Sequence, residues 1–241
     1  MRDEWLRGVM LRRDKVEDWS SFDEYPFNLP AVRNLHSLEL TKPVTYFVGE
    51  NGSGKSTLIE AIAIKWGFNP EGGSTAFRFS TAQSHSELHD YLRLIRAPHR
   101  PSDGFFLRAE SFFNVATQVD ELGVTGYGGT SLHKQSHGES FLTLMMERFR
   151  GDGLYILDEP EAALSPNRQL AMIARMHQLV RDASQFLIAT HSPILMAYPD
   201  ATILSCDGDA IHEVAYEETE HYTVTRDFLN HRRVMLKELL E

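Results

Sequence analysis

One short segment has the residue types and spacing of a phosphate-binding loop. It reads Gly49-Glu50-Asn51-Gly52-Ser53-Gly54-Lys55-Ser56-Thr57 and matches the pattern G-x-x-x-x-G-K-[ST]. Glycines let the backbone wrap closely around phosphate and point its N–H groups inward. We therefore expect these nine residues to bind the phosphates of ATP. Lys55 is expected to reach the β- and γ-phosphates, and the Ser56 hydroxyl to ligate Mg²⁺.

Two adjacent acids end an apolar run, Leu154-Tyr155-Ile156-Leu157-Asp158-Glu159. A carboxylate can hold Mg²⁺ through water, which is the role we expect for Asp158. Glu159 is then the base that aligns or deprotonates an attacking water. Adjacent strand residues point to opposite faces, so the two acids need not compete for one position. Beside the phosphate loop, this pair predicts hydrolysis of bound ATP.

The elements around the loop have the order that phosphate binding requires. Val44–Val48 is short, apolar and β-branched, as expected for a buried strand, and it precedes the loop. Lys55 to Trp66 has helical spacing, with Leu58, Ile59, Ile62 and Ala63 on one side. The helix adds the positive end of its dipole to the phosphate site.

The rest of the chain alternates between helix and strand patterns. Helices are expected at Ser86–Arg96, Ser140–Arg148, Asn167–Val180 and from Thr225 onward. Strands are expected at Gly104–Arg108, Leu154–Leu157 and Gln185–Thr190, and a hairpin at Ala201–Ser205 and Ala210–Tyr216. This alternation predicts an α/β fold with a largely parallel central sheet. In such sheets ligands bind at the carboxyl ends of the strands, where both motifs lie.

Composition limits the class of protein. The 241 residues suit one α/β domain, and 42% hydrophobic residues suffice for a sizeable core. No apolar run is long enough to cross a bilayer, and Met1–Trp5 lacks the apolar stretch of a secretory signal. The one cysteine, Cys206, excludes an internal disulfide and a cysteine metal site. We expect a cytoplasmic protein without membrane insertion.

The net charge of −10 excludes a uniformly basic surface that seeks nucleic acid. Local basic patches are still allowed. Basic residues form three small clusters in the sequence: Arg12, Arg13 and Lys15; Arg93, Arg96, His99 and Arg100; and Arg232, Arg233 and Lys237. We interpret each as a solvated face first, and as a nucleic-acid contact second.

Four segments together resemble the head of an ABC-type ATPase. They are Gly49–Thr57, Ser136-His137-Gly138-Glu139-Ser140, Leu154–Pro160 and Ala189-Thr190-His191-Ser192, in that order. With Phe105–Phe113 and Asp158–Pro166, the chain is similar over nearly its whole length to stand-alone bacterial AAA-family ATPases with a RecF/SMC/OLD-like head. The resemblance implies a single domain over residues 1–241, an antiparallel β part, and a helical lobe inserted at roughly 75–150.

The resemblance also implies a head-to-tail dimer that forms around two Mg-ATP. Ser136, Gly138 and Glu139 match the signature segment that closes over the γ-phosphate of a partner protomer, although His137 and Glu139 replace the usual Gly and Gln. A capping box, with Ser136 as N-cap and Glu139 three residues later, is the less favoured interpretation and is compatible with the signature role. Ser165 stands where the loop after the acidic pair usually has Asp.

Three further roles come from the resemblance alone. His191 matches the histidine that contacts the γ-phosphate and orients the water. Either Gln83 or Glu110 occupies the place of the glutamine that touches Mg²⁺, and we favour Glu110 because it follows the clearer strand. Tyr25 or Phe27 could stack on adenine, but core packing is the preferred interpretation.

Several functions are compatible with these features. The first is an ATP-dependent switch acting on an unknown protein partner or nucleic acid, in DNA repair or phage defence by analogy. The second is the ATP-binding subunit of a membrane transporter, which the altered signature disfavours. The third is an ATP-holding module without turnover, for which Glu159 and His191 would be superfluous. The fourth, a P-loop kinase, leaves His191 and the signature segment unexplained.

Overall fold

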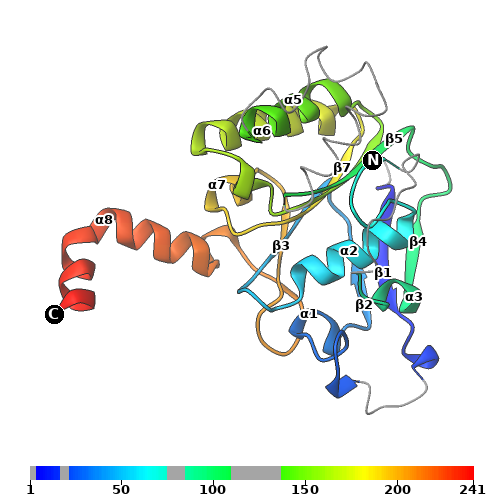
Figure 1. Cartoon of the computed structure of the whole chain (residues 1–241), viewed down its shortest axis with the longest axis horizontal. Coiled ribbons are helices and arrows are strands. Elements are labelled where there is room, and N and C mark those ends of the chain that lie inside the picture. The colour runs from blue at the N-terminus through cyan, green and yellow to red at the C-terminus, as the bar shows by residue number, and fades with distance from the viewer. Residues whose placement is uncertain (1–3, 17–21, 75–84, 110–136) are drawn as a thin grey trace.

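The computed structural model describes residues 4–16, 22–74, 85–109 and 137–241, whose strands form two sheets (Figure 1). The strands are β1 (Leu6–Leu11), β2 (Ser37–Glu39), β3 (Val44–Val48), β4 (Leu92–Arg96), β5 (Asp103–Arg108), β6 (Gly153–Asp158), β7 (Gln185–Ala189), β8 (Thr202–Ser205) and β9 (His212–Glu213). The α-helices are α1 (Pro30–Arg33), α2 (Lys55–Trp66), α3 (Leu88–Tyr91), α5 (His137–Arg148), α6 (Pro166–Arg181), α7 (Pro193–Met196) and α8 (Glu220–Leu240). Short 3-10 turns are η1 (Arg13–Lys15), η4 (Pro160–Ala163) and η5 (Tyr216–Glu218).

The larger sheet has six strands in the order β5-β6-β7-β3-β8-β9. All neighbours from β5 to β8 pair in parallel, and β9 pairs antiparallel with β8. All five residues of β3 are buried between β7 and β8, as expected for an inner strand of a parallel sheet. The predicted α/β class with a mostly parallel sheet is therefore confirmed. The carboxyl ends of β3, β6 and β7 meet at one edge, where the sequence motifs follow.

The smaller sheet is antiparallel, with the strand order β2-β1-β4. Its central strand, β1, pairs Val9 with Leu38 of β2 and with Leu94 of β4. This sheet is the expected antiparallel β part of the fold.

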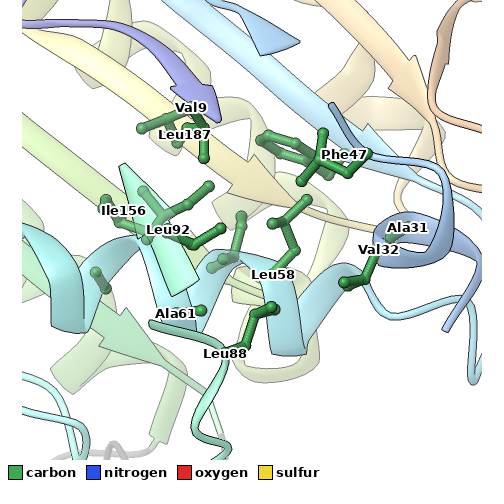
Figure 2. Packing of buried hydrophobic residues seen from close by; sticks show 14 of the residues in the cluster. Val9, Ala31, Val32, Phe47, Leu58, Ala61, Leu88, Leu92, Ile156 and Leu187 are labelled. Carbon is green, nitrogen blue, oxygen red and sulfur yellow. The ribbon is translucent and has the colours of Figure 1, made fainter. Parts of the chain in front are cut away.

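Two hydrophobic clusters cover opposite faces of the larger sheet. One contains Tyr155 and Phe186 from the sheet with Phe141 and Met172 from α5 and α6. The other cluster contains the residues of the larger sheet that point to the opposite face, together with residues of α1, α2, β1 and β4. In this cluster α2 packs against strands of both sheets. Figure 2 shows Leu58 of α2 among these residues. Because strand residues alternate between faces, α2 and α5 lie on opposite sides of the sheet.

One predicted helix, Ser86–Arg96, is wrong in its second half. The chain forms only the short helix α3 and then continues as strand β4. The apolar residues Leu88, Tyr91, Leu92 and Ile95 do have helical spacing, but β4 gains a full antiparallel ladder with β1. Pairing with a strand more than eighty positions away therefore overrides the local pattern.

The other described elements agree with the sequence expectations to within a few residues. The helix α2 spans Lys55–Trp66 as predicted, and Gly67, in the left-handed conformation, ends it. The hairpin of β8 and β9 is confirmed, and α8 begins at Glu220, five residues earlier than expected. About half of the range 75–150 predicted for the helical lobe, residues 75–84 and 110–136, lies outside the described residues. The described half is not all helical, because it contains the strands β4 and β5 beside α3 and α5.

Candidate nucleotide site

The loop between β3 and α2 has the backbone that phosphate binding requires. Gly49, Gly52 and Gly54 all have positive φ angles, of 138°, 86° and 95°. At Gly49 an added Cβ would lie 2.6 Å from Asp207 Oδ1, so a side chain is excluded for steric reasons also. At Gly52 nothing lies within 4 Å of such a Cβ, so only the positive φ favours glycine there. The loop therefore fits a phosphate group held by backbone N–H groups.

Lys55, the first residue of α2, folds back into this loop. Its Nζ donates to the carbonyl oxygens of Gly49 at 2.7 Å and of Glu50 at 2.8 Å. The side chain is 4% exposed. Burial lowers the pKa of the ammonium group, while the nearby carboxylates of Glu159, Asp207 and Asp158 act in the opposite direction. The ammonium is thus held at the mouth of the loop, where a phosphate oxygen could replace the two carbonyls.

Two of the three residues predicted to hold Mg²⁺, Ser56 and Asp158, lie side by side, and the third, Glu110, lies outside the described residues. Ser56 Oγ donates a hydrogen bond to Asp158 Oδ1 over 2.8 Å, and Asp158 is 6% exposed. Hydroxyl and carboxylate oxygens are the hard ligands that Mg²⁺ prefers. Among the described residues, no group of three or more His, Cys, Asp or Glu side chains forms a metal site. The Ser56 hydroxyl and the Asp158 carboxylate therefore fit two positions around a Mg²⁺ ion.

Arg108, the last residue of β5, joins the acidic side of the site to α2. Its Nε lies 3.5 Å from Asp158 Oδ2, and its Nη1 bonds the Glu60 carboxylate. Burial raises the pKa of Glu60, although Arg108 counteracts the effect. The guanidinium therefore connects α2 with the carboxyl ends of β5 and β6.

Glu159 lies just beyond β6, in a left-handed conformation with φ 50° and ψ 50°. Its N–H donates to the carbonyl oxygen of Ala189 over 2.9 Å, which ties the end of β6 to the end of β7. This turn brings the Glu159 carboxylate within 3.6 Å of His191 Nε2. The expected separation of Asp158 from Glu159 therefore arises because Glu159 has left the strand, and not from the alternation of strand residues.

His191 follows β7 and is held by its backbone and its ring. Its N–H donates to Glu161 Oε1 over 2.5 Å, and its Nδ1 lies 2.8 Å from His221 Nε2 of α8. Burial lowers the pKa of His191, and the positive charge of Lys55 lowers it further. The lowered pKa favours the neutral form of the ring near pH 7. A neutral imidazole beside a carboxylate can orient water or donate to a phosphate oxygen.

The residues that resemble the signature segment are only partly described. Ser136, with both candidates Gln83 and Glu110, lies outside the described residues. Gly138 and Glu139 begin α5, where Glu139 Oε1 pairs with Arg168 Nη2 at 3.0 Å. A Cβ on Gly138 would lie 2.5 Å from the carbonyl oxygen of Ala163. The start of α5 is therefore packed against η4 and the first turn of α6, on the other face of the sheet from α2.

Several of the candidates for adenine stacking and for nucleic-acid contact pack against or pair with neighbouring side chains. Phe27 is 7% exposed and packs edge-on against Tyr91, whereas Tyr25 is 63% exposed. In the basic clusters, Arg12 pairs with Asp14, and Arg96 stacks on Trp66. Core packing, the preferred interpretation for both residues, is therefore confirmed for Phe27 and wrong for Tyr25.

Four residues of the site were not found from the sequence. Asp207 Oδ1 accepts the Glu50 N–H over 2.8 Å and so supports the loop. Asp207 follows β8, which pairs in parallel with β3, so its place at the same strand edge was a usable signal. Arg108 and Glu161 also adjoin expected site residues. His221 had no local signal, because it belongs to a helix more than 160 residues after the loop.

Comparison with solved structures shows the fold. The structure of cbiO1 from Clostridium perfringens, part of the ABC transporter complex cbiONQ, matches with a TM-score of 0.51 and 16% identity, covering 98% of this chain and 100% of that one. An ATP-binding cassette of an ABC transporter, in its ADP conformation, matches with a TM-score of 0.50 and 17% identity, covering 100% of both chains. No curated protein sequence matches the chain. In the described residues no helix has the length and apolar character needed to span a bilayer.

Two family models match the sequence. One, described as AAA domain, covers residues 16–92. The other, described as AAA domain, putative AbiEii toxin, Type IV TA system, covers residues 75–197, slightly more than half of the 241 residues. The first includes the phosphate loop, and the second includes the acidic pair and His191. The chain therefore belongs to the family described as AAA domain, putative AbiEii toxin, Type IV TA system, and it has the fold of the ATP-binding cassettes of ABC transporters.

Proposed function

We propose that this protein hydrolyses ATP with the help of Mg²⁺ at the edge formed by β3, β6 and β7. Lys55 and the loop backbone bind the phosphates, and Ser56 and Asp158 hold the ion, which supplies charge stabilisation when bound. Glu159 is the general base for the attacking water, and His191 contacts the γ-phosphate.

One observation carries this proposal: the Glu159 carboxylate and the His191 imidazole lie 3.6 Å apart at the open end of the phosphate loop. A module that only holds ATP needs neither group. The two come from the ends of different strands and are placed by separate backbone ties, to Ala189 and to Glu161. Two polar groups held by separate backbone ties can position a water for attack on bound ATP.

The proposal includes dimerisation of two heads around two Mg-ATP. Gly138 and Glu139 lie across the sheet from α2, which supports a role for them at the nucleotide of a second copy. The start of α5 is packed against η4, which follows Glu159 directly. Binding of the signature segment to the nucleotide of a second copy would therefore affect the position of Glu159 in the first. An ATP-driven switch of this kind, acting on a partner in DNA repair or phage defence, is the proposed role.

The test is a comparison of wild-type protein with Glu159→Gln. Removing the base should lower phosphate release by at least about a hundredfold while ATP affinity stays within a few-fold. The solution mass of this variant, measured by light scattering, should change from monomer to dimer upon addition of Mg-ATP. Glu213→Gln, at an exposed residue of β9, is the matched control and should behave as wild type.

Two outcomes would contradict the proposal. Wild-type protein that binds ATP but releases no phosphate above background would exclude turnover by the isolated chain. A mass that stays monomeric, with ATP binding confirmed, would exclude the dimer while leaving hydrolysis to be judged by the phosphate assay.

A further inference from the structure

The first turn of α8 lies against the phosphate loop. A cavity of about 450 Å³ is lined by Glu50 and Asn51 of the loop, by His191, and by Glu220, His221 and Thr225 of α8. The rest of α8 extends away from the body of the protein (Figure 1), and none of its residues is buried. The side of α8 that meets the site therefore does so without contributing to the hydrophobic core.

A short contact joins α8 to His191. The nitrogens His191 Nδ1 and His221 Nε2 lie 2.8 Å apart, and the ring centroids are separated by 5.0 Å. On the other side of the ring, His191 Nε2 is buried, has no hydrogen-bond partner among the described residues, and lies 3.6 Å from Glu159 Oε1. The three side chains thus form a row, His221, His191 and Glu159.

Proton counting gives this row a direction. A hydrogen bond between two neutral imidazole nitrogens contains one proton, so one ring donates and the other accepts. The Glu159 carboxylate accepts only, which favours a proton on His191 Nε2. A neutral His191 then has no proton on Nδ1, so the proton of the contact belongs to His221 Nε2. The row therefore runs from the His221 N–H to His191 Nδ1, and from the His191 Nε2–H toward Glu159.

We propose that His221 is a positioning residue of the nucleotide site, which donates to His191 Nδ1 and so fixes the ring with its Nε2–H directed toward Glu159, where the proposed function places the γ-phosphate. The proposal rests on the proposed function for the identity of that ligand. The contact between His221 and His191, however, is formed by the chain itself and does not depend on a bound ligand. A partner group that fixes the tautomer and the orientation of a functional histidine has the same effect as the outer-shell ligands of metal sites.

The proton positions can be measured directly on the intact protein without nucleotide. With histidine labelled by ¹⁵N, His191 is assigned by the signal that disappears in His191→Gln. We expect His191 to carry its proton on Nε2, its Nδ1 to be a hydrogen-bonded acceptor, and a scalar coupling to connect Nδ1 to His221 Nε2. A proton found on His191 Nδ1, or the absence of that coupling, would overturn the proposal whether or not the protein hydrolyses ATP.

A kinetic test separates positioning from general stability. His221→Phe keeps a ring but has no donor, and it should lower kcat about tenfold with KM changed less than twofold. His221→Gln keeps an N–H donor and should retain most of the wild-type kcat. In a His191→Ala background, His221→Phe should have no further effect, because its action passes through His191. His231→Gln, at an exposed histidine of the same helix, is the control.

The kinetic test distinguishes a positioning role of His221 from a structural role of α8. Equal losses for His221→Phe and His221→Gln, or a loss that persists in the His191→Ala background, would show a structural role for α8 and overturn the proposal. A wild-type protein without turnover would instead contradict the proposed function, and the spectroscopic measurement would then decide on the His221 contact alone.

Discussion

Ser56 Oγ donates to Asp158 Oδ1 over 2.8 Å, although 102 positions separate the two residues in the chain. The contact exists because β3 and β6 run parallel on either side of β7, so that their carboxyl ends face the same edge. Each residue was predicted from its own local motif. Their contact follows from the sheet that those motifs require.

The Ser56 hydroxyl should account for the Mg²⁺ dependence of ATP binding. Mg²⁺ should raise the affinity of the wild-type protein for ATP, and in Ser56→Ala we expect this increase to be about ten- to a hundredfold smaller. That factor corresponds to the loss of one polar group that contacts a charge. Affinity measured in EDTA should be nearly unchanged. Calorimetric titration with a non-hydrolysable ATP analogue checks this, with Ser37→Ala, at an exposed residue of β2, as control. An equal Mg²⁺ effect in Ser56→Ala and wild type would contradict the assignment.

The glycines of the chain offer a matched pair that separates the site from the fold. In Gly49→Ala the new Cβ would lie 2.6 Å from Asp207 Oδ1, the atom that holds the Glu50 N–H. We expect this variant to lose ATP binding. Gly67→Ala also forces alanine into a positive φ, at 118°, but nothing lies within 4 Å of its Cβ. It should lose about 1–2 kcal/mol of stability and keep ATP binding.

Nucleotide affinity and thermal unfolding, measured on both glycine variants, check the prediction. If Gly49→Ala binds ATP as wild type does, Asp207 does not constrain the loop. If Gly67→Ala also loses binding at a temperature where it is folded, the effect of Gly49→Ala is not specific to the phosphate site.

The sequence predicted those parts of the site that depend on neighbouring residues. A glycine-rich turn between a strand and a helix, or an acid at the end of an apolar run, is specified within about ten positions. The segment Ser86–Arg96 fails this condition, because its second half is fixed by pairing with β1 and not by its own periodicity. Local propensity is a weak prior where a distant strand is available.

His221 shows a second limit of sequence reasoning. The motifs indicated that His191 would lie at the end of β7, which is correct. They did not indicate what would contact its ring, because α8 reaches the site by the path of the chain after β9. A polar residue on an exposed helix has no distinguishing pattern. Only the three-dimensional arrangement identifies such a partner.

Two buried tyrosines in the larger sheet should respond in opposite ways to loss of the hydroxyl. The Tyr155 hydroxyl donates to Asp103 Oδ2 over 2.8 Å and accepts the Arg150 N–H over 2.7 Å. The Tyr46 hydroxyl is buried with no hydrogen-bond partner among the described residues. Tyr155→Phe should therefore cost about 1–3 kcal/mol of unfolding free energy, because the partly buried Asp103 carboxylate loses one of its hydrogen-bond donors. Tyr46→Phe should be neutral or stabilising, because it removes an unsatisfied polar group.

Chemical denaturation of both tyrosine variants tests this difference at nearly constant side-chain volume. The slopes against denaturant should match that of wild type, so that the midpoints report stability. Equal losses in the two variants would mean that the hydroxyl contacts of Tyr155 contribute nothing beyond packing.

Glu161 should make the protein less stable as the pH rises. Burial raises the pKa of this carboxyl above its ordinary value of 4.5, although the His191 N–H opposes the shift. The native state then keeps the proton to a higher pH than the unfolded chain does. The unfolded chain binds fewer protons throughout the interval, so the stability contribution is complete below about pH 4.5 and is lost as the pH rises through the raised pKa.

Glu161→Gln removes this titration and keeps an oxygen that can accept the His191 N–H. Relative to wild type, its unfolding temperature should therefore increase progressively from about pH 4.5 to neutral pH, with the difference smallest at the acid end. Thermal unfolding across this range checks the sign, with Glu213→Gln, at an exposed carboxyl, as control. Parallel curves for Glu161→Gln and wild type would show that Glu161 titrates alike in both states. A stabilised variant with reduced ATP turnover would show that the charge of Glu161 is retained for function at the expense of stability.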